Sequence, residues 1–330
     1  MEYTGFLTTG RDQLNRLATD RRLVRGIRWG LSMAAFLVLG YVVVENWRML
    51  APLLNHGAYG WLAVALPVYL LAMAVAMVGW HSISRTLDVS RGALLDSTFY
   101  ALSMVAGRLP GGIWGLVARV YLYKSDSVTS GRVVAAWAIE QGVMLASALL
   151  CLSSCLIMTN PIGWSSSGRA LAVTFLLGVV GLCVKRPAVS SCLSIPLRKT
   201  PLRVLIDLER KSVFRWFAVY AAVWLLGGLL LFVLLQVFGP LPLTDLSQAE
   251  VAWIGSRGVA LLLTVLPTSF GITEISLALL LTPVVPGPVA VAVAVCARLI
   301  TTLGEALVAG GATIVGRINQ HGTGIGIERD

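Results

Sequence analysis

Two short breaks within apolar stretches carry residue types that could bind an anion inside a membrane. The first is RLPGG, residues 108–112, and the second is LPTS, residues 266–269. Proline blocks the continuation of a helix, whereas glycine permits a tight reversal of the chain. A helix that restarts near Ile113 would point free N–H groups and a partial positive charge at the first break. We therefore expect this helix end, with the guanidinium of Arg108 beside it, to suit a phosphate or a carboxylate.

Ionisable residues flank both breaks within segments that are otherwise apolar. Such groups are costly in a membrane and usually face a protein interior or a water-filled cavity. Their spacing also places Arg298 and Glu305 on one helix face, which predicts that these two side chains pair. For any single residue, snorkelling or a structural ion pair is the alternative, but the set as a whole favours a functional cavity. The set comprises Asp96, Arg108, Arg119, Glu140, Arg257, Glu274, Arg298 and Glu305.

The amino-acid composition indicates the class of protein in which these ionisable residues lie. Of the 330 residues, 57% are hydrophobic and only 13% are charged. Soluble proteins carry about 25% charged residues. A shortfall of this size indicates an integral membrane protein rather than a soluble protein with a large core. The net charge of +10 is explained better by membrane topology than by binding to nucleic acid.

No motif for a metal, a nucleotide or a covalent cofactor stands out. The five cysteines form no CxxC pair and lie mostly in apolar runs, which is typical of packing residues. The three histidines are far apart in the sequence. The glycines near the C-terminus lack the strand–helix context of a nucleotide-binding loop. We therefore predict no metal, no cofactor and no catalytic residue.

Several apolar runs are candidates for helices that cross the bilayer, which takes roughly 20 residues. The longest are residues 61–80, 133–158 and 216–238, and three further runs with polar or aromatic flanks are residues 30–44, 168–184 and 288–309. The run at 30–44 follows a long charged segment and precedes no small-residue cleavage site. It therefore predicts a retained helix rather than a removable signal peptide.

The basic residues predict the orientation of the chain, because cytoplasmic loops are enriched in Lys and Arg. Arginines are frequent in residues 11–28, and basic residues recur in residues 185–215. Placing both segments in the cytoplasm requires an even number of crossings between them. The short apolar pieces 93–107 and 113–123 then form a hairpin that enters from the cytoplasm and turns at Pro110–Gly112. Runs of about 10–14 apolar residues are more often re-entrant or buried than spanning.

The same count predicts that residues 251–266 and 270–281 form a second hairpin, which enters from the external side. Pro110 and Pro267 stand 157 positions apart, close to half the chain. Each half then contains two spans, a broken hairpin and a further span, and the two halves have opposite orientations. Paired broken segments of this kind point to the binding site of an inverted-repeat transporter. Two unrelated kinked helices are the alternative.

The predicted fold class is therefore an all-α polytopic membrane protein. It has about six full transmembrane helices and two broken re-entrant hairpins in an inverted repeat. We expect a basic cytoplasmic tail at residues 1–28, a single transmembrane domain at 29–311 and a cytoplasmic tail at 312–330. Within the domain, the first repeat covers about 29–158 and the second about 168–311. The predicted location is the cytoplasmic (inner) membrane, with both termini in the cytoplasm.

Three motifs together resemble the flippase-like, lysylphosphatidylglycerol synthase transmembrane family. They are Gly107–Trp114 followed by Arg119 and Glu140-Gln141, then Leu266–Glu274, and finally Ala297–Leu299 with Gly304-Glu305. The resemblance covers residues from about Trp61 to Gly311. It implies a prokaryotic membrane protein that handles anionic lipids or lipid-linked sugars. The sequence predicts a stand-alone membrane module without an aminoacyl-transfer domain, so aminoacyl transfer by this chain alone is not expected.

The charges, the breaks and the family motifs together define a predicted substrate-binding site. Its ligand would be an anionic phospholipid or a polyprenyl-phosphate-linked sugar, held between the two opposed hairpins. The predicted binding residues are Arg108, Pro110, Gly111, Gly112, Trp114, Arg119, Glu140, Arg257, Gly271, Glu274, Arg298 and Glu305.

Three functions fit these features. The first is translocation, or flipping, of an anionic lipid or lipid-linked sugar across the membrane. The second is a non-catalytic membrane partner of a separate glycosyltransferase or lipid-modifying enzyme. The third, an intramembrane enzyme with Glu140 or Glu274 as acid or base, ranks last because no nucleophile set or metal cluster supports it. A transporter needs a cavity reachable from both faces of the membrane, whereas a scaffold needs a broad contact surface.

Overall fold

The structure, a computed structural model, describes the parts of the chain that surround the candidate site. These are residues 41, 44–45, 47–50, 56–108, 113–124, 128–159, 210–262 and 269–322. The predicted span at 168–184 and most of that at 30–44 lie outside the described residues, as do both predicted tails apart from residues 312–322. A short helix, α2 (Trp47–Leu50), precedes the main bundle.

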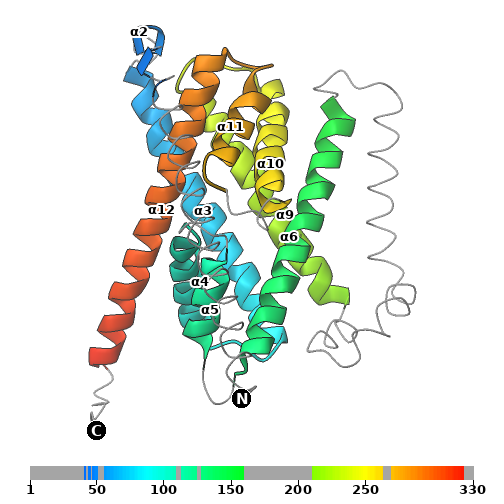
Figure 1. The fold of residues 1–330 in the computed structure, drawn as a ribbon, viewed down its shortest axis with the longest axis vertical. Coiled ribbons are helices and arrows are strands. Elements are labelled where there is room, and N and C mark those ends of the chain that lie inside the picture. The colour runs from blue at the N-terminus through cyan, green and yellow to red at the C-terminus, as the bar shows by residue number, and fades with distance from the viewer. Residues whose placement is uncertain are drawn as a thin grey trace, which may run out of the picture.

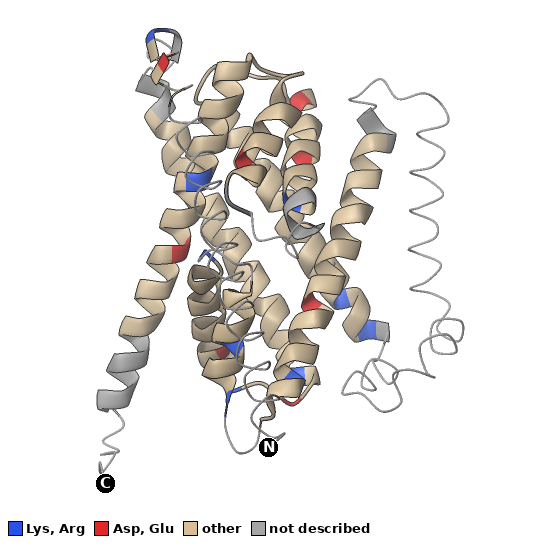
Figure 2. Cartoon of the chain, viewed as in Figure 1, with Lys and Arg blue, Asp and Glu red and all other residues tan. Residues whose placement is uncertain are grey.

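Four long helices form the body of the molecule (Figure 1). They are α3 (His56–Thr86), α6 (Ser130–Thr159), α9 (Arg210–Leu235) and α12 (Gly287–Gly322). Each is long and apolar enough to cross a membrane. Figure 2 shows that charged residues are sparse along them. The predicted all-α polytopic membrane fold is confirmed, and these helices contain nearly all of the predicted spans 61–80, 133–158, 216–238 and 288–309.

Two pairs of shorter helices occupy opposite ends of this body. The first pair is α4 (Ala93–Gly107) and α5 (Trp114–Tyr123). The second is α10 (Leu246–Leu262) and α11 (Ser269–Leu281), preceded by the short helix η3 (Leu243–Asp245). In Figure 1 the first pair lies at the end of the bundle where α12 finishes, and the second at the end where α12 begins. Helices α4, α5 and α11 are too short to cross a bilayer singly, and α10, with 17 residues, only reaches the lower limit of that length.

The first half of the bundle, α3 to α6, and the second half, α9 to α12, make matching contacts between helices. Helix α4 packs on α3 and α12, just as α10 packs on α9 and α6. Helix α5 contacts α6 as α11 contacts α12, and α3 and α9 pack against each other. Because the corresponding hairpins lie at opposite ends of the bundle, this pattern has the arrangement of an inverted repeat.

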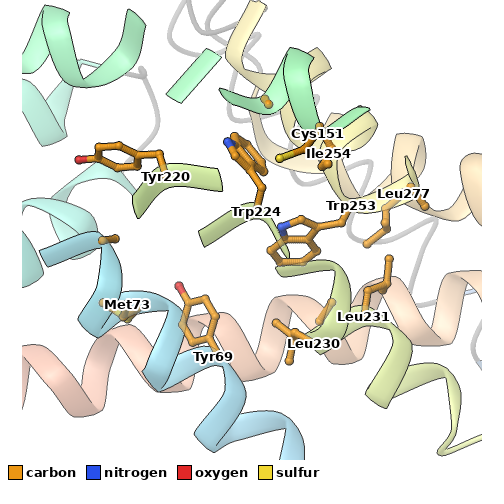
Figure 3. Packing of buried hydrophobic residues seen from close by; sticks show 14 of the residues in the cluster. Tyr69, Met73, Cys151, Tyr220, Trp224, Leu230, Leu231, Trp253, Ile254 and Leu277 are labelled. Atoms are coloured by element: carbon orange, nitrogen blue, oxygen red, sulfur yellow. The ribbon is translucent and has the colours of Figure 1, made fainter. Parts of the chain in front are cut away.

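The packing between α3 and α9 forms the centre of the core. Trp80 and Trp216 are fully buried, as are Tyr220 and Leu230. The indole N–H of Trp216 donates to Ser82 Oγ at 2.9 Å, so this interior polar group has a partner. Figure 3 shows Tyr220, Leu230 and neighbouring side chains of this cluster.

A buried carboxylate attaches the first hairpin to the end of α3. Asp96, fully buried in the first turn of α4, lies 2.6 Å from His81 Nδ1. Its oxygens also accept hydrogen bonds from Ser84, Ser90, Tyr123 and the backbone N–H of Arg91. Because the donors come from α3, from α5 and from the turn before α4, this network fixes the base of the hairpin.

Candidate functional site

A cavity of about 400 Å³ lies where the two halves meet, and arginines from both halves line it. Arg108 follows the last residue of α4 and Arg119 belongs to α5, whereas Arg257 lies on α10 and Arg298 on α12. Glu305 is the one acidic residue among the described lining residues. The wall also has an aromatic part, which consists of Tyr69, Tyr100, Trp137, Trp224 and Trp253.

Arg108 joins the first hairpin to the last helix of the second half. Its Nε donates to Glu305 Oε2 at 2.7 Å, and its Nη2 donates to Glu305 Oε1 at 2.6 Å. Nη2 also donates to Thr301 Oγ1 at 3.2 Å, and Tyr69 OH donates to Glu305 Oε1 at 2.9 Å. The two-point geometry is the strong form of an arginine–carboxylate contact. Among the described ion pairs, this pair alone connects the two halves.

Arg119 and Glu140 form a buried ion pair within the first half. Their side chains are 4% and 1% exposed. Arg119 Nε donates to Ser103 Oγ at 2.9 Å, and Tyr220 OH donates to Glu140 Oε1 at 3.0 Å. The guanidinium also stacks on the ring of Trp80, 4.1 Å from the ring centroid. These additional contacts are what a desolvated ion pair needs if it is to remain favourable.

Glu274 and Arg298 form the corresponding pair in the second half, with the charges exchanged. Glu274 Oε1 lies 3.1 Å from Arg298 Nη1, and Glu274 Oε2 accepts the backbone N–H of Gly271 at 3.0 Å. Gly271 has φ +86°, a conformation that glycine adopts at low cost. In each half, therefore, an ion pair attaches the second helix of the hairpin to the long helix that follows it.

Two buried guanidinium nitrogens at the cavity have no hydrogen-bond partner among the described residues. They are Nη1 of Arg108 and Nε of Arg257. Arg257 stacks on Trp253, with its guanidinium carbon 4.5 Å from the ring centroid, and none of the described ion pairs includes it. Buried donors without partners are rare, so an acceptor delivered by a ligand is a physical reason for this pair.

The structure brings most of the predicted site residues together. Arg108, Arg119, Arg257, Arg298 and Glu305 line the cavity. Behind them, Glu140 and Glu274 bind Arg119 and Arg298, and Gly271 binds Glu274. Trp114 begins α5 but is 42% exposed and is not among the lining residues. Pro110, Gly111 and Gly112 lie outside the described residues.

One predicted pairing is wrong. Arg298 and Glu305, which share a helix face in the sequence, do not pair with each other: Arg298 contacts Glu274 and Glu305 contacts Arg108. The hairpins pack against α12 and supply a closer partner for each side chain. Spacing along one helix could not identify partners that are 24 and 197 positions away along the chain.

Sequence reasoning did not identify the aromatic part of the wall. Tyr69, Tyr100 and Trp224 lie inside apolar helices, where an aromatic residue is typical of packing. The signal that could have found them was the number of tryptophans, 10 in a chain with 8% aromatic residues. Among the described residues, no group of histidines, cysteines and acids could hold a metal ion.

Comparison with known protein families identifies the group to which this arrangement belongs. Residues 28–309 match the lysylphosphatidylglycerol synthase TM region. The chain belongs to this family. The match includes both hairpins and all four long helices, up to residue 309 of α12. It confirms the resemblance drawn from the sequence motifs and indicates a membrane role related to lipids. No curated protein gave a significant match.

Proposed function

We propose that the chain binds the phosphate-bearing head group of an anionic lipid or lipid-linked sugar in the arginine cavity and moves it across the cytoplasmic membrane. The observation that carries this proposal is the pair of unpartnered donors, Arg108 Nη1 and Arg257 Nε, at one cavity. They come from opposite hairpins, so a phosphate that bound both would bridge the two halves. Membership of a lipid-related family supports the same ligand class.

The charge of the cavity supports an anion as the ligand. Three arginines at the cavity have a carboxylate partner, and Arg257 has none among the described residues. The cavity therefore carries one positive charge more than its carboxylate partners neutralise. A bound monoanion would neutralise that charge, whereas a cation would add to it. Because a desolvated charge without a partner costs several kcal/mol, the cavity should discriminate by the sign of the head-group charge.

The contact between Arg108 and Glu305 offers a way for the ligand to act on the fold. A phosphate can take the same two-point contact on a guanidinium that Glu305 now occupies. Exchange of Glu305 for the head group would release the first hairpin from α12. The proposed transport step is this release, with each half held together by its own ion pair, Arg119–Glu140 or Arg298–Glu274.

Positive residues at the helix ends and in the connecting segments support the proposed orientation. Lys124 and Arg132 lie at the end of the bundle where the first hairpin begins, and residues 185–215 of the sequence are rich in basic residues. This end would face the cytoplasm, as would both termini. The aromatic part of the cavity wall would suit the sugar of a lipid-linked sugar or the glycerol of a phospholipid.

The test is translocation in vesicles that contain the purified chain. Fluorescent phosphatidylglycerol would be placed in both leaflets, and the fraction accessible to a membrane-impermeant quencher would be followed against empty vesicles. We expect the accessible fraction to rise for phosphatidylglycerol and to stay unchanged for phosphatidylcholine. Equal rates for both lipids would refute selection by charge. If no lipid moves, including polyprenyl phosphate, transport is wrong and a membrane-partner role is favoured.

A further inference from the structure

Helix α10 carries an acid and a base that take part in none of the described ion pairs: Glu250, which is buried, and Arg257, whose Nε is buried. Glu140, Glu274 and Glu305 each contact an arginine, and Asp96 contacts His81 and three hydroxyl groups. Glu250 and Arg257 have no such partner in the described part of the chain. They are seven residues apart, which is about two helical turns and places them on the same side of α10.

Glu250 lies in a space that α9 leaves open for it. Its side chain is buried, the residue being 5% exposed, and its Oε2 has no hydrogen-bond partner among the described residues. A Cβ on Gly228 of α9 would collide with the Glu250 carboxyl group, and a Cβ on Gly227 would collide with the indole of Trp253. Two glycines in an apolar helix therefore make room for an acid and for the ring next to Arg257.

The surroundings of Glu250 suit a proton better than a metal ion. The titratable groups within electrostatic reach of it on α6 are the thiols of Cys151 and Cys155. A hard cation would need several oxygen ligands, which glycines and thiols do not supply. Among the other ionisable groups on elements that pack against α10, two already have a partner within the protein. Glu274 of α11 pairs with Arg298, and Tyr220 of α9 donates to Glu140. Asp245 of η3 lies five residues before Glu250 along the chain.

We propose that Glu250 is a proton-binding site and that the second hairpin takes up one proton there for each anionic head group bound at Arg257. Without ligand, the Glu250 carboxylate offsets the charge of Arg257 from about two helical turns away, without forming an ion pair with it, so Arg257 stays available to an anion at the cavity. With ligand, the anion balances Arg257, and the carboxylate accepts a proton from water to become a neutral carboxyl group. Helix α10, counted with its ligand, is neutral in both states, which avoids the cost of an uncompensated buried charge. The inference rests on the proposed function, because it requires an anion at Arg257.

Proton uptake on binding tests this directly and does not depend on transport. The detergent-solubilised chain would be titrated with a short-chain phosphatidylglycerol in buffers that differ in ionisation enthalpy. The slope of binding heat against buffer enthalpy gives the number of protons taken up. We expect about one proton per head group for the parent and none for Glu250→Gln. Glu250→Asp keeps a titratable group and should keep the uptake, and Asp245→Asn is the control that should behave as the parent.

Vesicles then separate this inference from the proposed function. A pH-sensitive dye inside vesicles should report protons moving with phosphatidylglycerol for the parent, and this signal should be lost in Glu250→Gln. Binding without proton uptake, or uptake that survives in Glu250→Gln, would overturn the inference even if lipid moves. A rate that follows a sodium gradient at constant pH would also overturn it. Proton uptake on binding without any lipid movement would support the Glu250 site and refute transport.

Discussion

At the scale of single residues, the site combines charges that are paired within the protein with buried donors that have no partner among the described residues. Arg119 and Glu140 are buried together and bound by Ser103 and Tyr220, so their charges are satisfied within the protein. Arg108 and Arg257 each retain a buried nitrogen without a partner among the described residues. Substitutions in these two groups should therefore have opposite consequences.

Arg257→Gln should weaken ligand binding and leave the fold intact. Loss of hydrogen bonds to a charged group should reduce affinity for phosphatidylglycerol by about 1.5–3 kcal/mol. Stability should change little, because none of the described ion pairs includes Arg257, and Glu250 can take up a proton once the arginine's charge is removed. Binding would be measured by titration of the purified chain, with Arg132→Gln, at an exposed position, as the matched control. An unchanged affinity would remove Arg257 from the site.

Glu140→Gln should instead destabilise the chain. It leaves Arg119 as a buried charge without its counter-ion, which costs about 3–5 kcal/mol in comparable cases. The thermal unfolding midpoint in detergent should fall clearly. The double variant Arg119→Met with Glu140→Leu should lose less, because it removes both charges. If the single and double variants unfold alike, the ion pair is not what holds α5 to α6.

At the scale of elements, glycines set how closely the second hairpin approaches α9. Gly228→Ala should press on Glu250, and the overpacking should cost about 1–3 kcal/mol. Gly142→Ala on α6 is the matched control, since nothing lies within 4 Å of a Cβ there. The control should be neutral or slightly stabilising because alanine favours helix over glycine. Unfolding in detergent would compare the two, and equal stability would contradict the close packing.

The sequence predicts most helix bounds well, because the length of each apolar run and the proline and glycine residues between the runs determine where a helix can begin and end. The predicted pieces 93–107 and 113–123 match α4 and α5 almost residue for residue, since Pro110, Gly111 and Gly112 separate them. The start of α10, by contrast, lies at Leu246 rather than 251. The apolar pattern is interrupted by Gln248 and Glu250, and the close approach of Glu250 to Gly228 of α9 shows how the packed structure accommodates these polar residues.

Partners within the site could not be predicted in the same way. The arginines and acids stood out because charges are rare in apolar segments, but their pairing depends on helices far apart in the sequence. Glu305 pairs with Arg108 across the two halves, and no pattern local to α12 encodes that contact. The aromatic residues of the wall were hidden among apolar neighbours for a similar reason.

At the scale of the whole molecule, the two hairpins should be reached from opposite sides of the membrane. On a cysteine-free background, Lys124→Cys, next to the first hairpin, should react with an impermeant thiol reagent from the cytoplasmic side only. Leu243→Cys, 79% exposed beside the second hairpin, should react from the external side only. Charge bias in the loops and the opposed ends seen in Figure 1 are the reasons. Labelling of both positions from one side would contradict the inverted arrangement.

The central claim is that an anionic head group binds between the two halves at Arg108 and Arg257. An experimental structure of the chain in lipid nanodiscs that contain phosphatidylglycerol tests it most directly. We predict density for a phosphoryl group in the cavity, within hydrogen-bond distance of Arg108 Nη1 and Arg257 Nε, and no such density in nanodiscs of phosphatidylcholine alone. A cavity closed by protein side chains, with both guanidinium groups satisfied by the chain itself, would contradict the account.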